Sequence, residues 1–573
     1  IRDSRASRGL GDVYKRQFLD YDNNRNLVSL YTPGGKRLSW DYDGQDRVVS
    51  RTTPGGETVK YAYDGGVLRT ITDGQGRVYT LTFNDRYDLE LLQFPNGLFR
   101  RWEYDGRGRL VQAVDVKGNV TRYAYDRADN LIRLEEPDGN VHRFEYDAMG
   151  NMVHASDNIR EVKFTYGALG VLKSREQDRH WITFGYNSEL QLRRIGNEAG
   201  DNYFFELDGL GQVVAETGFD GLRREYERDG AGRVTRVNRP GGKWTEYQYD
   251  GLDNILKEEQ YDGEVSLYTY DKDGMLVKAK NSENLLEFTR DRKTGLVTEE
   301  RQGEYTVSRT YDGEGNCTRI TSSLGADIRH TYDREGNLQT MQAGEGWQAS
   351  WVRDNTGLEV QRTFSGGVTV CTERDGFGRE VRKSVRSGGI ERGAYRYEWG
   401  IAGRLLSKEN ELTGTVMRYD YDRFDFLIRQ EMTKGSETDV IYRVPDFVGN
   451  LFGTPDRKDR KYGAGGKLLE DPDCFYHYDD EGNLIFREFK QLQETGVRYD
   501  RKRMEKERGI RCLATGTGWL YEWASNGMLK KVIRPDGRPV EFRYDALGRR
   551  TAKQYFGKAT RWVWAVSYTH LTL

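Results

Sequence analysis

The sequence predicts an all-β chain in which tandem β-hairpins of about 21 residues form one continuous, spiralling sheet that wraps into a hollow shell. Three observations support this fold class. A tyrosine or other bulky residue, most often followed by aspartate, recurs at a period of about 20 residues along most of the chain. Glycine and proline turn signals separate short alternating segments. The mean hydropathy is -0.84, which is low for a chain of 573 residues built around a solid core.

The recurring position is the main evidence for the repeat. Copies with tyrosine and aspartate lie at Tyr21, Tyr42, Tyr63, Tyr104, Tyr125, Tyr146, Tyr249, Tyr270, Tyr311, Tyr332, Tyr421, Tyr478 and Tyr544. Degenerate copies lie at Phe83, Tyr166, Tyr186, Leu207, Arg228, Arg290, Arg353, Arg374, Trp399, Tyr499 and Trp523. A fixed period of this kind marks a repeat architecture, so each copy is expected to be one structural unit.

Each unit is predicted to be a hairpin. Polar and aromatic residues alternate in Arg143–Tyr146, as in a strand with two different faces. Asp147 can accept hydrogen bonds from turn N–H groups, and Gly150 suits the positive φ that closes the turn. Asn151–Val153 then begins the return strand, and turns such as Glu136–Gly139 connect neighbouring units. The tyrosine is expected to pack between units, and no capped helix is expected anywhere.

Stacking of neighbouring hairpins is expected to supply the stability that one hairpin lacks. About 40 strands spaced ~4.8 Å apart would give a ribbon of roughly 190 Å. Bent into a single ring, this ribbon would be ~60 Å across, wide enough to enclose a domain of ~100 residues.

The repeat divides the chain into segments. Residues 18–430 are predicted to form the main repeat shell, and residues 471–564 to form further repeats. The period is lost between them, so residues 431–470 are predicted to be an irregular insertion or a change of direction.

Both ends of the chain resemble foreign sequence. Codons for Ser7–Gln17 can be chosen so that their complementary strand, in another frame, encodes Val566–Leu571, and the shared element resembles a transposase adapter. Residues 1–17 and 565–573 are therefore predicted to be non-native tails. The natural protein is then expected to continue beyond both ends.

Composition excludes several classes of protein. The 89 basic and 91 acidic residues are mixed along the chain and give a formal charge of -2, so neither nucleic acid nor an anionic membrane is expected as the main partner. No apolar run reaches the ~18 residues that a membrane helix needs. The cysteines are too dispersed for a disulfide framework or a zinc site: Cys317, Cys371, Cys474 and Cys512.

No catalytic, cofactor-binding or metal-binding residue is predicted. Gly463–Lys467 lacks the spacing and the hydroxyl residue of a phosphate-binding loop. In Asp271–Gly274 the glycine comes too early for a calcium loop. Cys474 and His477 have no second ligand pair nearby, so packing roles are favoured for both. The Tyr–Asp pairs recur too often to be catalytic.

Tyr-Asp-x-x-Gly followed by Asn or Arg and an aliphatic residue resembles the YD-repeat, or Rhs, family, with its teneurin-like YD shells, over residues 18–564. The stretches that carry this resemblance most specifically are Trp519–Trp523, Gly527–Leu529, Pro535–Gly537, Phe542–Arg549 and Thr560–Trp564. The resemblance implies a bacterial polymorphic toxin, made in the cytoplasm and exported by type VI or another route. It also implies a β shell around a variable C-terminal toxin domain, which is absent from this chain, and a cognate immunity protein.

The family's shell ends in a DPxGL-type self-cleavage motif, which the chain lacks. Asp471-Pro472-Asp473 departs from that motif, so no catalytic residue is carried over. Three functions remain open: a non-catalytic shell that encloses and delivers a toxin, a cell-surface YD-repeat adhesin that binds glycans through exposed aromatic residues, and an enzyme. The first is preferred.

Overall fold

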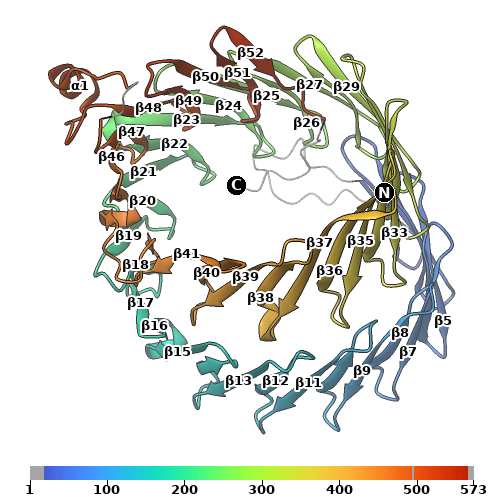
Figure 1. Ribbon diagram of the computed structural model, residues 1–573. Coiled ribbons are helices and arrows are strands. Elements are labelled where there is room, and N and C mark those ends of the chain that lie inside the picture. Colours follow the sequence, from blue (N-terminus) through green and yellow to red (C-terminus); the bar gives the residue numbers. More distant parts are fainter. Residues whose placement is uncertain (1–17, 493–495, 566–573) are drawn as a thin grey trace.

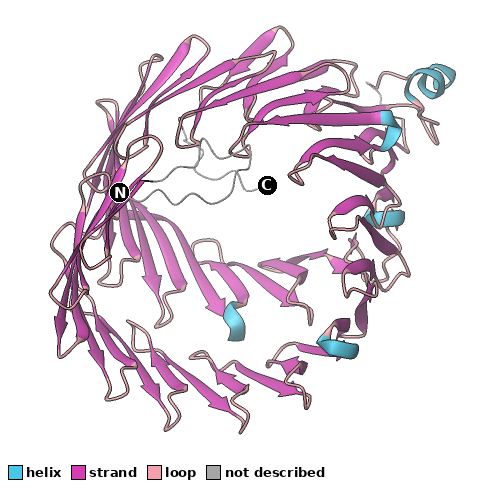
Figure 2. Cartoon of the chain, turned by 180° about the vertical axis from the view of Figure 1, so that it is seen from behind, coloured by secondary structure: helices cyan, strands magenta, loops and turns pink. Residues whose placement is uncertain are grey.

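The computed structural model describes residues 18–492 and 496–565 and is an all-β shell (Figure 1). Strands β1 (Phe18–Tyr21) to β41 (Glu437–Tyr442) form one antiparallel sheet of 41 strands, each paired with the next along the chain. A two-stranded sheet and a nine-stranded sheet follow. The strands lie around the periphery, and no described strand or helix occupies the centre of either view (Figures 1 and 2). The predicted fold class is confirmed.

The odd-numbered strands of the large sheet each end at a recurring position, except that β5 extends one residue further and β41 lies beyond the regular period. The strands after β1 are β3 (Arg37–Tyr42), β5 (Thr58–Asp64), β7 (Val78–Phe83), β9 (Phe99–Tyr104), β11 (Val120–Tyr125), β13 (Val141–Tyr146), β15 (Glu161–Tyr166), β17 (His180–Tyr186), β19 (Asn202–Leu207), β21 (Arg223–Arg228), β23 (Lys243–Tyr249), β25 (Val265–Tyr270), β27 (Leu285–Arg290), β29 (Tyr305–Tyr311), β31 (Asp327–Tyr332), β33 (Trp347–Arg353), β35 (Val368–Arg374), β37 (Ile390–Trp399) and β39 (Thr415–Tyr421). The predicted hairpin period is thus confirmed through residue 421.

The even-numbered strands are the return strands. They are β2 (Leu27–Tyr31), β4 (Val48–Thr52), β6 (Val67–Thr72), β8 (Leu89–Gln93), β10 (Leu110–Val114), β12 (Leu131–Glu135), β14 (Met152–Ser156), β16 (Leu172–Gln177), β18 (Leu192–Gly196), β20 (Val213–Thr217), β22 (Val234–Arg239), β24 (Ile255–Gln260), β26 (Leu276–Lys280), β28 (Val297–Gln302), β30 (Cys317–Ser322), β32 (Leu338–Ala343), β34 (Glu359–Phe364), β36 (Glu380–Ser387), β38 (Leu405–Asn410) and β40 (Leu427–Lys434). Most begin at an aliphatic residue.

The large sheet ends at Tyr442, inside the segment predicted to be irregular. Two turns with the backbone hydrogen bond of the repeat persist there: Asp446 donates its N–H to the carbonyl of Asn450, and Gly463 donates to that of Lys467. The repeat turn therefore continues at irregular spacing, since successive turns begin at Asp422, Asp446, Gly463 and Asp479. The remaining elements are β42 (Val444–Pro445), β43 (Leu451–Phe452), β44 (Lys461–Tyr462), β45 (Leu468–Glu470), β46 (Cys474–Tyr478), β47 (Leu484–Phe489), β48 (Gly518–Trp523), β49 (Leu529–Ile533), β50 (Pro539–Tyr544), β51 (Arg550–Tyr555), β52 (Lys558–Arg561) and single-turn 3₁₀ segments at Ala168–Gly170, Pro240–Gly242, Ile401–Gly403 and Ala464–Gly466.

The expectation that the chain has no capped helix is wrong. Helix α1 (Arg501–Arg508) lies between β47 and β48, on the outside of the shell (Figure 2). Asp500 caps its first turn by accepting a hydrogen bond from the N–H of Arg503, and Gly509 ends it in the left-handed conformation. Tyr499, predicted to be a repeat position, therefore precedes a helix and not a hairpin turn.

The ribbon coils into a spiral in which each turn lies against the preceding one. Residues 34–243 contact residues 273–525, and residues 268–302 contact residues 544–564 one turn further along. Hydrogen bonds between successive turns join residues that are 238 to 286 positions apart in the chain. The single ring of ~60 Å expected from a ~190 Å ribbon is therefore wrong, because the same ribbon is shared between successive turns.

Burial is distributed unevenly along the spiral. Most strand residues of the large sheet are only half-buried, as expected for a thin wall. The described residues contain one apolar cluster of buried side chains, formed by Phe486, Met504, Ile510 and Leu520, where α1 packs near β47 and β48. The nine-stranded sheet is thus the part of the wall that has a local core.

Candidate functional site

The aspartate of the repeat holds the hairpin turn. Asp147 Oδ1 accepts hydrogen bonds from the N–H groups of Met149 and Asn151 at 2.9 Å, and its Oδ2 accepts one from Asn151 Nδ2 at 2.9 Å. Gly150 has a φ of +83°, which a glycine adopts without strain. The Asn151 side chain is the main cause that lowers the pKa of Asp147. The carboxylate is therefore a structural acceptor, and we call this element the Asp turn.

Arginine replaces asparagine in many Asp turns and adds a second contact. Arg109 Nε donates to Asp105 Oδ2 at 2.8 Å, and this bond is the main cause that lowers the pKa of Asp105 to about 2. Arg109 Nη1 also donates to the carbonyl of Asp126 in the next hairpin at 2.9 Å. These contacts explain why either Asn or Arg follows the glycine: both donate to the aspartate, and arginine also links neighbouring hairpins.

The tyrosine of the repeat joins one hairpin to the preceding one. Tyr146 donates its hydroxyl to the carbonyl of Leu131, the first residue of β12, at 3.0 Å. Burial raises the pKa of Tyr146, which keeps the donor protonated. The same bond to the first residue of a preceding strand is made by Tyr42, Tyr63, Tyr104, Tyr166, Tyr186, Tyr249, Tyr270, Tyr311, Tyr332, Tyr421, Tyr478 and Tyr544.

Several degenerate copies keep this donor with a different side chain. Trp399 Nε1 donates to the carbonyl of Glu380 at 2.7 Å, and Trp523 Nε1 donates to that of Leu484 at 2.8 Å. Guanidinium groups donate to the equivalent carbonyl from Arg228, Arg290, Arg353 and Arg374. At most copies the recurring position therefore holds a long side chain with an N–H or O–H donor, a rule that aromatic spacing alone did not reveal; Phe83 and Leu207 are exceptions.

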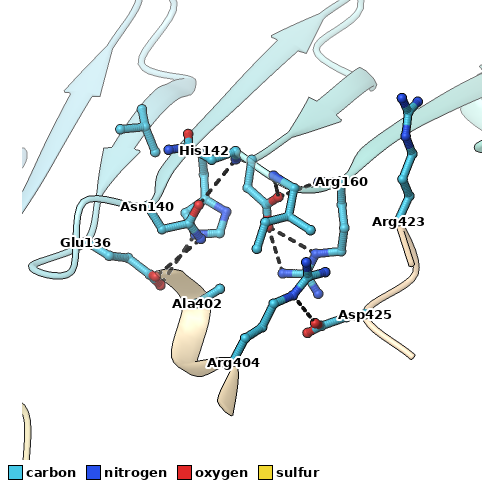
Figure 3. Close-up of polar contacts among 12 residues, drawn as sticks. Glu136, Asn140, His142, Arg160, Ala402, Arg404, Arg423 and Asp425 are labelled. Atoms are coloured by element: carbon cyan, nitrogen blue, oxygen red, sulfur yellow. Dashed lines mark hydrogen bonds and ion pairs between the residues drawn. The ribbon is translucent and has the colours of Figure 1, made fainter. Parts of the chain in front are cut away.

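Contacts between the two turns of the spiral follow one pattern. Connecting turns of the first turn meet turns of the second that stand at the Asp-turn position of the repeat, although glycine replaces the aspartate at Gly400 (Figure 3). Asp138 Oδ2 accepts from the N–H of Ala402 at 2.8 Å, and Gln177 Nε2 donates to the carbonyl of Arg423 at 3.2 Å. The buried Asn140 supports the first-turn side by accepting from the N–H of Asn158 at 3.2 Å.

The most deeply buried ionic network also joins successive turns, further along the spiral. Arg549 Nη1 lies 2.6 Å from Glu300 Oε1, and Arg549 Nε lies 2.7 Å from Asp545 Oδ2. Arg309 pairs with the other oxygen of Glu300 at 3.3 Å. The side chains of Arg549 and Glu300 are fully buried. Asp545 and Arg549 form an ordinary Asp turn. This repeat element therefore also makes the contact between β28 and the β50–β51 hairpin.

A second buried carboxylate holds the loop that carries α1. Glu488 accepts hydrogen bonds from the N–H groups of Leu513, Ala514 and Gly516 at 2.7 to 2.9 Å, and lies 3.1 Å from His477 Nε2. Burial alone would raise the pKa of Glu488, but these hydrogen bonds lower it to about 2. Sequence reasoning missed Glu488, because nothing in a strand of alternating residues distinguishes it.

The motifs that the sequence singled out have structural surroundings. Lys467, at the end of the glycine-rich segment, pairs with Asp220 at 3.5 Å. Asp273 pairs with Lys36 at 3.1 Å, across the two turns. Cys474 Sγ lies 3.1 Å from Arg487 Nε, while His477 faces Glu488. In the described part of the chain, no three His, Cys, Asp or Glu side chains are grouped so that they could hold a metal ion.

A hollow of about 680 Å³ lies where the large sheet ends. It lies between strands of the first turn and the β42–β44 region of the second. Its lining includes the rings of Phe219, Phe447, Phe452 and Tyr462 and the carboxyl groups of Glu198, Asp201 and Asp446. Within the described ranges, no helix is long and apolar enough to cross a membrane.

Comparison with known sequences identifies the repeat. The profile of the RHS Repeat family matches residues 20–58, 42–78, 104–141, 125–158 and 525–560. The chain is 29% identical over 223 residues to the probable deoxyribonuclease RhsB of Dickeya dadantii (strain 3937). It is also 29% identical over 217 residues to the double-stranded DNA deaminase toxin A of Burkholderia cenocepacia (strain H111). These matches cover 37% and 36% of this chain but only 14% and 13% of the relatives.

Solved structures show the same arrangement of strands. The crystal structure of TcdB2-TccC3 matches 95% of this chain with a TM-score of 0.53 at 12% identity, and this chain covers 39% of it. A Tc holotoxin pore from Photorhabdus luminescens, carrying the TccC3 mutation D651A, matches 94% with a TM-score of 0.54 at 13% identity, and 39% of it is covered. The chain therefore contains RHS repeats at the matched segments, and its spiral β sheet has the fold of these toxin structures.

Proposed function

We propose that this chain is part of the wall of a shell that encloses a C-terminal toxin domain, keeps it enclosed until delivery and performs no chemistry itself. The observation that carries the proposal is the continuous spiral sheet, whose second turn is joined to the first through side chains and backbone. The two relatives named above are a probable deoxyribonuclease and a deaminase toxin, and both are much longer than this chain. Their activities would then belong to segments outside this wall.

The proposal includes the surroundings of such a shell. The natural protein would be made in the bacterial cytoplasm and released to the outside or displayed at the cell surface by a secretion apparatus, type VI or another. A cognate immunity protein would protect the producing cell. The enclosed toxin domain would be the main partner of the inner wall.

Limited proteolysis of the longer natural protein tests enclosure. The segment that follows residue 564 should resist protease in the intact protein and be digested once the shell is opened by denaturant. The same segment, expressed alone and folded, is the control and should be digested under the native conditions. Equal digestion of the attached and the isolated segment would refute enclosure.

The hollow at the end of the large sheet favours carbohydrate binding as a second candidate, because aromatic faces beside carboxylates suit a sugar ring. A glycan array on this chain, repeated with the variants Phe219→Ala and Phe447→Ala, tests this function. Hits that both substitutions abolish would support an adhesin, whereas absence of hits would exclude it.

A further inference from the structure

The large sheet ends in a strand that is paired on one side only. β41 is hydrogen-bonded to β40 and is the last strand of the 41-stranded sheet (Figure 1). The next return strand, β43, is too short to cover it, because it pairs only with Val444 and Pro445. Gly453 then donates its N–H to the carboxylate of Asp459, and the chain turns away. Among the described strands, none pairs with the second edge of β41, which we call the free edge.

The backbone groups at the free edge can be identified from the pairing with β40. Arg443 donates its N–H to the carbonyl of Ile428 at 2.8 Å, on the β40 side. Successive residues of a strand direct their N–H and C=O groups to opposite sides, so those of Thr438, Val440 and Tyr442 point away from β40. In the described part of the chain, no hydrogen bond uses the backbone N–H or C=O groups of these three residues. The free edge therefore presents a row of unused donors and acceptors.

The side chains of β41 favour pairing with another strand. Thr438, Val440 and Tyr442 are β-branched or aromatic, the residue types that strands prefer. β41 contains neither the lysine nor the proline that commonly protects an edge strand. Ile441, on the opposite face, is 48% exposed. These features suit the addition of one extended strand through main-chain hydrogen bonds.

The charged side chains along the free edge indicate what such a strand carries. Glu437 and Asp439 are exposed at one end of β41, and the exposed Arg443 follows its other end. Within the described ranges, none of the three forms an ion pair. Their side chains lie on one face of the strand, since even numbers of residues separate them. An antiparallel partner with basic residues opposite the two carboxylates and an acidic residue opposite Arg443 would therefore be complementary.

We propose that the free edge of β41 docks an extended segment of a second protein. This segment adds an antiparallel strand whose side chains are acidic, then apolar, then basic from its N-terminal end. The main-chain groups of Thr438, Val440 and Tyr442 hold it, and the charges of Glu437, Asp439 and Arg443 select it. The inference concerns an external partner and does not depend on the proposed toxin cargo.

A second copy of the chain matches the free edge less well than a single segment. In the two-fold pairing that uses all three free residues, Val440 would face itself and Asp439 would face Ile441, so one carboxylate of each copy would stay unpaired. The wall also resumes nearby, because the Tyr462 hydroxyl of β44 donates to the carbonyl of Leu451 in β43. This arrangement favours one added strand over the whole sheet that a second copy would bring.

Fluorescence anisotropy with two labelled peptides tests the proposal on the 573-residue chain. The matching peptide is Glu-Thr-Val-Ile-Lys-Thr-Lys, whose residues fall opposite Arg443 to Glu437 in turn. The control peptide, Lys-Thr-Val-Ile-Glu-Thr-Glu, reverses its charges and keeps its apolar residues. The matching peptide should bind at least about tenfold more tightly, because like charges that face each other oppose pairing. Equal affinities, or no binding of the matching peptide at about 1 mM, would overturn the proposal.

Substitutions in the chain show whether the peptide occupies the free edge. The double variant E437K/D439K should reverse the preference between the two peptides. The matched control E103K/E145K changes the same charges on strands that are paired at both edges and should leave the preference unchanged. Val440→Pro removes an N–H that faces away from β40, so it should abolish binding without accelerating hydrogen exchange in β40.

Two outcomes contradict the assignment of the site or of its occupant. If E437K/D439K leaves the peptide preference unchanged, the peptides bind elsewhere and the proposal is wrong. If neither peptide binds and the chain forms a dimer that E437K/D439K dissociates, the occupant is a second copy and the proposal is equally wrong.

Discussion

The large sheet and the nine-stranded sheet are built from the same hairpin but bury different groups. In the large sheet, repeated hydrogen bonds from tyrosine and aspartate hold each hairpin to its neighbour, and most side chains remain half-exposed. In the nine-stranded sheet, an apolar cluster, a buried Glu488 and a fully buried Arg549 are added. The comparison teaches that many modest contacts suffice within the ribbon, whereas its last strands are fixed by a few strong contacts.

The largest effect is expected where that fixation depends on buried charge. Arg549→Ala leaves Glu300 and Asp545 buried beside an empty site, and removing one partner of a buried ion pair costs about 3–5 kcal/mol. Hydrogen exchange in β50 and β51 should accelerate accordingly. The matched control is Arg109→Ala, which removes the same turn contact at a partly exposed site and should cost at most ~1 kcal/mol. Equal losses of stability for the two variants would show that the two sheets do not differ in the strength of their individual contacts.

A smaller loss is expected at the loop between β47 and β48. Glu488→Gln replaces a carboxylate that accepts three backbone hydrogen bonds, and bonds to a charged group contribute about 1.5–3 kcal/mol. Amide exchange of Leu513, Ala514 and Gly516 reports this loss directly. Glu522→Gln, which alters only a surface pair with Arg508, should leave those amides unchanged.

Within the large sheet, loss of a single tyrosine hydroxyl should have a modest and local effect. Tyr146→Phe removes the donor to the carbonyl of Leu131 and should cost ~1 kcal/mol, measured by exchange in β12 and β13. Tyr87→Phe is the control, because Tyr87 is 70% exposed. A cost of several kcal/mol for Tyr146→Phe would mean that the ribbon depends on single contacts.

The aspartates and the tyrosines of the repeat should lose their stabilising contributions at opposite ends of the pH range. The Asp-turn carboxylates have lowered pKa values, so their contribution is present above the unfolded-state pKa near 4 and is lost as the pH falls toward 2. The repeat tyrosines that donate to the preceding hairpin, which we call clamping tyrosines, have raised pKa values. Their contribution to stability is therefore present below pH 10 and is lost above it. Circular dichroism from pH 2 to 12 should show both transitions. Substituting several clamping tyrosines by phenylalanine should weaken only the alkaline transition.

The sequence was sufficient to predict the hairpins but not their stacking. A period of about 21 residues determines where strands and turns lie, because each unit repeats the same local chemistry. The number of residues in one turn of the spiral depends on small rotations between neighbouring strands, which no single motif encodes. The ring prediction failed for this reason.

Two local features were missed for different reasons. Helix α1 is short and strongly charged, and Met504 is its only buried residue, so no apolar periodicity marks it. The capping residues Asp500 and Gly509 can be recognised in the sequence, but Tyr499-Asp500 resembles one more copy of the repeat. Asp446–Asn450 was missed because Pro445 stands where the repeat has an aromatic residue, although the Asp turn itself is complete.

The pairing of connecting turns with Asp turns has a consequence for how the gene can change in length. Deleting one complete hairpin would leave the ladder of strand pairing intact, yet every later Asp turn would face a different connecting turn. Specific pairs such as Asp138 with Ala402, and Glu300 with Arg549, would be lost together. Insertions and deletions of hairpins should therefore occur in compensating sets, or else within the irregular stretch between Tyr442 and Lys461, where a change in length need not alter the sheets on either side.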